Sequence, residues 1–428
     1  MAPPPRPAEL PPGAADTREL HAFLLEVGRA LALAGTAVSE TQERLTRIAA
    51  ANGAHDARIV VLPTALLIAF GRARFTTIES VPQLTGALRL DQVSALYELA
   101  KEAERGEIDV SAGLKRIERI RTMRPRHGRF VTVLAYAVMV AGLCLILQPT
   151  PADVVIAAAF GALVGCLVLL ARGRQALSVL IPVLCATLIS ALSFEAVQHG
   201  IADPGLRTLI APLVTFLPGS ALTTATVELA SGEMVAGASR LVFGSLQLLL
   251  LAFGIVAGAE LAGLPSEAVV DDAHANLLGW WAPWLGVLVF GIAASVYFSA
   301  PDGALVWLLV VLLAAWIGQL VGDRLFGPDV SGFFGALAMT PVALAVARLP
   351  GGPPSQVTFL PAFWLLVPGA IGLIGVTEVV GNPAAATLQD LVQPLGAVVG
   401  IALGVLCGVS LARGVGRAPA HRRRDAIG

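Results

Sequence analysis

From about residue 130 to residue 412 the chain is a succession of long apolar stretches joined by short polar links. Each stretch approaches the roughly 20 residues that a helix needs to cross a bilayer core of about 30 Å. The links leave no room for a second soluble domain. This pattern predicts ten transmembrane helices, at residues 130–147, 153–171, 176–197, 206–229, 238–262, 280–299, 303–322, 332–348, 357–380 and 391–412.

The N-terminal part of the chain has the pattern of a small soluble α/β domain. Apolar residues recur at helical spacing from Leu20 to Leu31 and again further on, which predicts two helices. Ser39, with Gln42 three residues later, predicts a capping box at the second of them. Short β-branched and apolar runs then predict three strands before two more helices. We place the strands at residues 58–62, 65–70 and 75–78 and the helices near 91–104 and 110–121.

Composition and charge support this division into two regions. Hydrophobic residues make up 56% of the 428 residues and charged residues 14%, against roughly 45–50% and 25% in soluble domains. Residues 1–129 hold 18 of the 29 Lys+Arg and 15 of the 30 Asp+Glu. The proline-rich start lacks the apolar core of a signal peptide, so we predict a disordered cytoplasmic tail.

The fold class that we expect is an α-helical polytopic membrane protein with a small soluble α/β domain at its N-terminus. The predicted domains are a disordered tail (1–16), a cytoplasmic α/β domain (17–129), two five-helix membrane repeats (130–264 and 265–412) and a basic cytoplasmic tail (413–428).

The arginine and lysine residues predict the orientation in the membrane. Seven of them crowd the approach to the first predicted helix, from Lys115 to Arg129, which places the N-terminus in the cytoplasm. If ten helices alternate, nine later arginines fall inside and only Arg207 and Arg324 fall outside. One missed helix would invert every later assignment. We therefore expect a multi-pass protein of the cytoplasmic (inner) membrane with both termini in the cytoplasm.

The membrane part contains an internal repeat at an offset of 150 residues. Pro218-Gly219 then falls on Pro368-Gly369 without a gap. Each predicted repeat has five helices, and because five is odd the second copy crosses the membrane in the opposite sense. Such inverted repeats are typical of secondary transporters. Three further pairs keep the same register: Glu228 with Glu378, Gly254 with Gly404, and Gly258 with Gly408.

Each Pro-Gly pair lies near the middle of the fourth apolar segment of its repeat. Pro218 cannot donate a hydrogen bond to the carbonyl of Val214, nor can Pro368 donate one to that of Trp364, so both helices are expected to break there. Freed backbone groups are tolerated at membrane depth only if protein buries them or they line a cavity. We therefore predict a substrate site at the breaks, formed by Pro218, Gly219, Ser220, Thr223, Thr224, Glu228, Arg240, Pro368, Gly369 and Glu378.

Several of these residues also have a simpler interpretation. Ser220, Thr224 and Glu228 share one helix face with Thr223 adjoining, where hydroxyls and free N–H groups suit an anion. The hydroxyls could equally bond back to carbonyls of their own helix. For Glu228 we favour an ammonium or proton partner over a solvated helix end, because ionisable residues in membrane segments are costly. For Arg240 we favour an interfacial anchor over a pair with Glu228.

The sequence gives little support to other classes of function. The cysteines and histidines show no metal-ligand spacing, and we expect no catalytic residues, metal or cofactor. A net charge of -1 without a basic patch argues against nucleic acid as a partner. Ser39 lacks a G-x-S-x-G elbow, so a membrane-bound hydrolase is a weak alternative. A gated channel is the other alternative. Gln247 and Gln319 could bond a neighbouring helix as well as a substrate.

Together these features resemble the threonine/serine exporter family over nearly all of the chain. The stretch LHAFLLEVGRALALAGTAVSETQERLTRIAAANG and the strands RIVVLPTALLIAFG are similar to the family's soluble N-terminal region. The stretch FLPGSALTTATVELASGEMVAGASR resembles the signature of the first membrane half, and LVPGAIGLIGV that of the second. At the acidic position we expect aspartate, and this chain has Glu228, which puts the family's substrate selectivity in doubt.

The resemblance implies export of threonine and serine driven by the proton gradient. A related arrangement, with the two halves on separate chains, resembles a carboxylate exporter, so dicarboxylates are the alternative substrates. The residues by themselves indicate transport of a small polar metabolite, with that substrate, a proton and the lipid bilayer as partners, and they leave a homo-oligomer open. We expect the N-terminal domain to be regulatory or assembly-related rather than catalytic.

Overall fold

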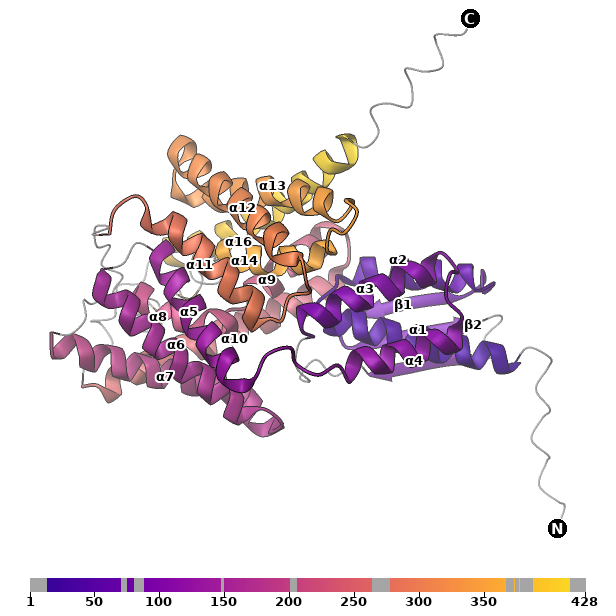
Figure 1. Cartoon of the computed structure of the whole chain (residues 1–428), viewed down its shortest axis with the longest axis horizontal. Coiled ribbons are helices and arrows are strands. Elements are labelled where there is room, and N and C mark those ends of the chain that lie inside the picture. Colours follow the sequence, from indigo (N-terminus) through magenta and orange to yellow (C-terminus); the bar gives the residue numbers. More distant parts are fainter. Residues whose placement is uncertain are drawn as a thin grey trace, which may run out of the picture. The chain divides into compact units, whose positions relative to one another are not determined.

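The computed structural model describes residues 14–70, 75–80, 88–147, 150–200, 206–263, 278–366, 373, 377 and 388–415. The chain divides into two compact units. The smaller consists of Met1–Leu88 and Ala95–Arg124, and the larger of Arg89–Ser94 and Pro125–Gly428. Figure 1 colours the elements of both units along the sequence.

The smaller unit combines helices with a three-stranded antiparallel sheet in the order β1-β2-β3. Alternate residues of β1 and β2 are buried, and helices α1 and α2 pack against these two strands. Its elements are α1 (Ala14–Leu33), α2 (Val38–Ala51), β1 (Arg58–Leu62), β2 (Ala65–Phe70), β3 (Phe75–Ser80), most of α3 (Leu90–Glu104) and α4 (Val110–Arg121).

The strands and helices of this unit lie close to their predicted places, but the predicted capping box is wrong. The helix α2 begins at Val38, so Ser39 lies inside it, and the cap residue Ala37 offers no side-chain hydrogen bond. The side chain of Gln42 instead accepts a hydrogen bond of 3.3 Å from the backbone N–H of Val61. Gln42 therefore links α2 to β1 rather than closing the helix end.

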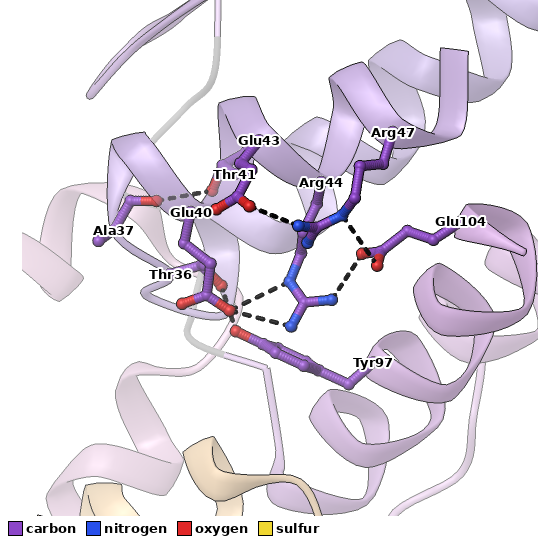
Figure 2. A network of polar contacts seen from close by, with 9 residues as sticks. All are labelled: Thr36, Ala37, Glu40, Thr41, Glu43, Arg44, Arg47, Tyr97 and Glu104. Atoms are coloured by element: carbon purple, nitrogen blue, oxygen red, sulfur yellow. Dashed lines mark hydrogen bonds and ion pairs between the residues drawn. The ribbon is translucent and has the colours of Figure 1, made fainter. Parts of the chain in front are cut away.

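A network of charged side chains joins α2 to α3 within the smaller unit (Figure 2). The guanidinium of Arg44 contacts Glu104 at 2.7 Å and Glu40 at 3.0 Å, and it lies 4.7 Å from the ring centroid of Tyr97. Arg47 contacts the same Glu104 carboxylate at 3.2 Å. Because each charge has more than one partner, the network fixes α3 against α2 at its C-terminal end.

The larger unit is helical, and its described helices lie close to the predicted apolar stretches, of which 357–380 is described mainly up to Leu366. Its fourth segment is interrupted, with α8 and α9 separated by a short 3-10 turn. The helices are α5 (Arg129–Ile146), α6 (Pro151–Ala171), α7 (Gln175–Gln198), α8 (Leu206–Leu213), the 3-10 turn η1 (Val214–Phe216), α9 (Gly219–Ala230), α10 (Met234–Leu261), α11 (Ala282–Tyr297), α12 (Ala304–Phe326), α13 (Pro328–Val346), α14 (Ser355–Leu366) and α16 (Leu388–Val415).

Within the described ranges, seven helices are long and apolar enough to cross a membrane. The bent pair Leu209–Phe216 and Gly219–Ala230, with 54° between its parts, would make an eighth span. Ala282–Tyr297 and Ser355–Leu366 are shorter apolar helices. The chain is thus an α-helical, multi-pass membrane protein, and ten spans remain a prediction.

Two pairs of helices pack through glycines at matching positions. A Cβ atom on Gly254 of α10 would lie 2.8 Å from the Cβ of Ala186 on α7, and one on Gly404 of α16 would lie 2.8 Å from the Cβ of Ala336 on α13. The two glycines are 150 residues apart, and so are the two alanines. The next turn repeats the match, with Gly258 facing Ser190 and Gly408 facing Thr340.

The helices α5 and α11 also approach closely, and they run in opposite directions. A Cβ atom on Gly142 would lie 2.6 Å from the backbone nitrogen of Phe290, and one on Gly286 would lie 3.0 Å from that of Ile146. Residue numbers rise along α5 as they fall along α11, so the two helices are antiparallel.

Candidate functional site

The first predicted break is present between α8 and α9. The helix α8 ends at Leu213, one 3-10 turn follows, and α9 begins at Gly219. Pro218 has no N–H for the carbonyl of Val214, and that carbonyl accepts a hydrogen bond of 3.2 Å from the N–H of Leu217 instead. The proline thus ends one helix, and its own carbonyl, which accepts from Leu222 at 2.9 Å, begins the next.

Side chains from two other helices bind the carbonyls that the break exposes. The hydroxyl of Tyr136 on α5 donates to the carbonyl of Pro212 at 2.7 Å and lies 2.9 Å from the hydroxyl of Thr215. The amide of Gln247 on α10 donates to the carbonyl of Phe216 at 2.6 Å. The freed groups are therefore buried in protein, as the membrane environment requires. The sequence leaves open whether Gln247 bonds a neighbouring helix or a substrate, and in the structure it bonds the neighbouring helical segment.

The start of α9 is a buried helix N-terminus. Pro218 and Gly219 are both buried, and Ser220 is half-buried. The first N–H groups of any helix have no partner within it, and the helix dipole adds partial positive charge there. The helix α9 packs against α10, α14 and α16, so it lies among helices from both predicted halves. Such a place suits a carboxylate.

The hydroxyl groups of α9 do not all behave alike. Thr226 bonds back to the carbonyl of Leu222 at 3.0 Å. Thr223 is 1% exposed, and its hydroxyl has no hydrogen-bond partner among the residues that the structure describes. Thr224 is half-buried. Simple back-bonding thus accounts for Thr226 and does not account for Thr223, whose hydroxyl is left for another partner.

Glu228 lies in the last turns of α9 and forms an ion pair. It is 1% exposed, and its Oε2 lies 3.1 Å from Nε of Arg240 on α10. The structure therefore has the pair, the less favoured of the two sequence interpretations of Arg240, whose side chain is 15% exposed. A solvated Glu228 at the helix end is excluded by its burial.

The second predicted break lies outside the described residues. The helix α14 ends at Leu366, and Pro368, Gly369 and Glu378 lie outside the described residues. Thr377 is described and buried, and its hydroxyl has no hydrogen-bond partner within the described ranges. The predicted roles of the three undescribed residues stay predictions.

One residue of the site was missed in the sequence. Tyr136 lies in the middle of the first apolar segment, and its hydroxyl binds the break in α8 and η1. The tyrosine inside an apolar segment was itself a signal of this role, because a buried tyrosine hydroxyl in a membrane segment needs a hydrogen-bond partner. Within the described part of the chain, no group of three His, Cys, Asp or Glu side chains is placed to hold a metal ion.

Comparison with known proteins gives a family and distant relatives. Residues 22–262 match the family model described as threonine/serine exporter. Proteins named Pheromone-regulated membrane protein 10 are similar to this chain. The one from Eremothecium gossypii is 22% identical over 302 residues, covering 67% of this chain and 39% of its own length. The one from Saccharomyces cerevisiae is 23% identical over 303 residues, covering 67% and 38%.

The chain spans less than half the length of these curated relatives. Their name identifies them as membrane proteins and gives no substrate. No solved structure is significantly similar to the chain.

Proposed function

Because this chain belongs to the threonine/serine exporter family, we propose that it is a secondary transporter that exports threonine and serine, driven by the proton gradient. The observation that carries the proposal is the buried break before α9, which combines a helix N-terminus, a hydroxyl without a described partner and a buried acidic residue on one 12-residue helix. Broken helices of this kind bind substrates in secondary transporters.

The geometry of α9 separates two roles. Gly219 and Glu228 are nine residues apart, which corresponds to roughly 14 Å along a helix. The carboxylate and ammonium groups of one amino acid lie only a few ångströms apart, so a single substrate does not reach both ends of α9. We therefore assign the substrate's carboxylate to the N-terminus at Gly219 and the proton to Glu228, rather than giving Glu228 the ammonium group.

Thr223 is the residue that we assign to the substrate's polar side chain. It follows Gly219 by four residues, roughly 6 Å along the helix axis, and helical side chains lean towards the N-terminus. A site that hydrogen-bonds a substrate hydroxyl discriminates strongly against analogues that lack it. This role fits the small hydroxy amino acids and gives no advantage to a dicarboxylate.

The Glu228–Arg240 pair supplies a means of coupling to protons. Arginine stays protonated in proteins, so the pair is neutral while Glu228 is ionised and carries one positive charge once Glu228 binds a proton. An uncompensated buried charge is costly. We propose that proton binding at Glu228 releases Arg240 and so drives the helices α9 and α10 towards a second arrangement.

We also propose that the two five-helix halves are inverted repeats. The glycine contacts of α10 on α7 and of α16 on α13 match at an offset of 150 residues. The first helices of the two halves, α5 and α11, run antiparallel, as helices related by an axis in the membrane plane do. Both observations support the repeat.

The orientation that we propose places both termini in the cytoplasm. In the larger unit, the first turn of α3 bonds to the turn between α11 and α12, where the N–H of Leu90 donates to the carbonyl of Phe298 at 3.0 Å. With ten alternating helices, six crossings precede Phe298, which returns it to the side of the N-terminus. A periplasmic signal from a reporter fused after Arg413 would contradict this count.

The proposal is tested by efflux of labelled threonine, serine and succinate from loaded vesicles, with and without an uncoupler. We expect saturable efflux of threonine and serine that the uncoupler abolishes, and little efflux of succinate. Succinate efflux without threonine efflux would establish the dicarboxylate alternative. Flux that neither saturates nor depends on the proton gradient would identify a channel.

A further inference from the structure

The C-terminal end of α11 is bound by the N-terminal end of α3. The N–H groups of Leu90 and Asp91 donate to the carbonyls of Phe298 and Ser299, both at 3.0 Å. These N–H groups have no partners inside α3, and the carbonyls at the end of α11 have none inside that helix. Each helix end therefore supplies the hydrogen-bond partners that the other end lacks, and the two helix dipoles attract each other. All of these residues belong to the larger unit.

The turn between α11 and α12, to which α3 is hydrogen-bonded, has an unusual backbone conformation. Ser299 adopts a φ of 54°, the left-handed conformation in which glycine is the usual residue at a helix end. The N–H of Ala300 donates back to the carbonyl of Ser295 at 2.7 Å. On the other side, Arg126 holds Asp302 through two hydrogen bonds of 2.8 and 2.6 Å. Tertiary contacts thus hold the turn in this conformation.

Two neighbouring aromatic side chains at this turn contact Trp364 of α14 and Tyr136 of α5. The ring of Phe298 lies 4.4 Å from that of Trp364 on α14, the helix that precedes Pro368. The ring of Tyr297 lies 4.9 Å from that of Tyr136, whose hydroxyl binds the first break. The rings of Tyr297 and Phe298 lie 4.7 Å apart. One short segment therefore contacts α14 and, through Tyr136, the break before α9.

The helix α3 continues from this contact into the smaller unit. It is a single helix from Leu90 to Glu104, and Ala95 onwards belongs to the smaller unit. There Tyr97 and Glu104 are held by Arg44 and Arg47 of α2 (Figure 2).

We propose that Tyr297 and Phe298 are positioning residues for the break before α9 and for α14, and that the first turn of α3 sets their position. The proposal rests on the proposed transport function for its meaning, since the break before α9 is the proposed substrate site. Its structural content, the dependence of these two segments on the first turn of α3, is independent of the substrate.

The first experiment compares two variants of Leu90 in the full-length chain in lipid nanodiscs. Leu90→Pro removes the N–H that binds Phe298, and proline is well tolerated at the first position of a helix. Leu90→Ala loses the leucine side chain and keeps the N–H, so it is the matched control. The readout is amide hydrogen exchange of Leu209–Leu222 and of Ser355–Leu366. We expect about fivefold faster exchange of both segments in Leu90→Pro than in Leu90→Ala, the factor for one hydrogen bond of about 1 kcal/mol.

A second set of variants tests the contact of Tyr297 with Tyr136 and the contact of Phe298 with Trp364 separately. Tyr136→Phe removes the hydroxyl and should speed exchange in Leu209–Leu222 alone. Phe298→Leu removes a ring and should speed exchange in Ser355–Leu366. Phe326→Leu is its control, because Phe326 is stacked on Phe334 at 4.9 Å at the other end of α12. We expect this control to leave both segments unchanged.

Equal exchange of both segments in Leu90→Pro and Leu90→Ala would overturn the proposal. Efflux kinetics add a functional readout, in which Leu90→Pro should lower the maximal rate several-fold relative to Leu90→Ala and leave KM unchanged. If the wild-type chain exports neither threonine nor serine, the proposed function fails, while the exchange comparison still decides whether α3 positions the two segments.

Discussion

Two glutamates of this chain contact arginines at similar distances and in different surroundings. In the smaller unit, Arg44 and Arg47 contact Glu104 at 2.7 and 3.2 Å. In the larger unit, Arg240 contacts Glu228 at 3.1 Å. The side chains of Arg44 and Glu104 are 18% and 15% exposed, whereas that of Glu228 is 0% exposed. Solvent therefore reaches the side chains of Arg44 and Glu104 and is excluded from the carboxylate of Glu228.

This difference predicts different consequences when a charge is removed. A partly exposed network shares each charge among several partners and is screened by water, so one lost contact costs little. Removing one member of a buried pair leaves the other charge uncompensated, which costs about 3–5 kcal/mol. Buried charges in membrane segments therefore persist mainly where function needs them. The Glu104 network fits a structural role, and the Glu228 pair fits a functional one.

The largest effect is expected from Glu228→Gln, which keeps the shape of the side chain and removes its charge. We expect efflux of threonine to fall at least about tenfold, equivalent to 1.4 kcal/mol or more, and its dependence on pH to disappear. Because Arg240 is then unpaired, the double variant Glu228→Gln with Arg240→Gln is the control for folding. It should recover the yield and thermal stability of the wild type and stay inactive. Wild-type efflux with the same pH dependence in Glu228→Gln would make the residue a bystander.

Thr223→Val is the next test, because it removes a buried hydroxyl from the same helix without touching a charge. Valine has nearly the same shape as threonine, and a buried hydroxyl without a partner opposes folding. We expect thermal stability to be equal to or higher than that of the wild type, and KM for threonine to rise about tenfold, equivalent to 1.4 kcal/mol. Thr226→Val is the matched control, since Thr226 bonds its own helix. An equal rise of KM in both variants would refute the assignment.

A smaller effect is expected from Glu104→Gln in the smaller unit. This change removes the carboxylate that Arg44 and Arg47 share, and Arg44 keeps its contact with Glu40 at 3.0 Å. We expect a loss of about 1 kcal/mol in stability, measured by the denaturation of the full-length chain, and transport within about twofold of wild type. A loss as large as that of Glu228→Gln would remove the distinction between the two contacts.

The smallest effect is expected at Asp302, which is 92% exposed. The hydrogen bonds and charge of Arg126 lower the pKa of Asp302, and the same contact raises the pKa of Arg126. A carboxyl whose pKa is lowered on folding contributes stability above its unfolded pKa of about 3.9 and loses it as pH falls through the lower folded value. The difference in stability between wild type and Asp302→Asn, measured by denaturation, should therefore be small and constant from about pH 5 to 8. This difference should disappear as the pH falls below about 4.

The sequence predicts the membrane segments well because their length and apolarity are set directly by the bilayer. The predicted segment 153–171, for example, differs from α6 only by two residues at its start. The break at Pro218 is also predicted, since proline removes a specific hydrogen bond. The bend of 54° and the partners of the freed carbonyls depend on how helices pack, and the sequence pattern does not contain them.

Contacts between side chains distant in the sequence were the least predictable part of the site. Tyr136 and Pro212 are 76 residues apart, and only the packing of α5 against α8 brings them together. The position of Arg240 in the sequence favours the membrane interface, whereas the antiparallel packing of α9 and α10 brings its side chain to Glu228. The capping box at Ser39 failed for a similar reason, because β1 offers Gln42 a different partner.

The glycines on α10 and α16 have a consequence for how this chain can move. Where Gly254 and Gly258 face α7, and Gly404 and Gly408 face α13, a Cβ atom added to any of these glycines would lie less than 3.0 Å from an atom of the facing helix. Helices in such contact cannot slide past one another without a steric clash. We infer that α7 with α10, and α13 with α16, each move as one rigid body. Any change of state is then confined to the joints between these bodies, and a methyl group added at one of the four glycines would wedge such a body open.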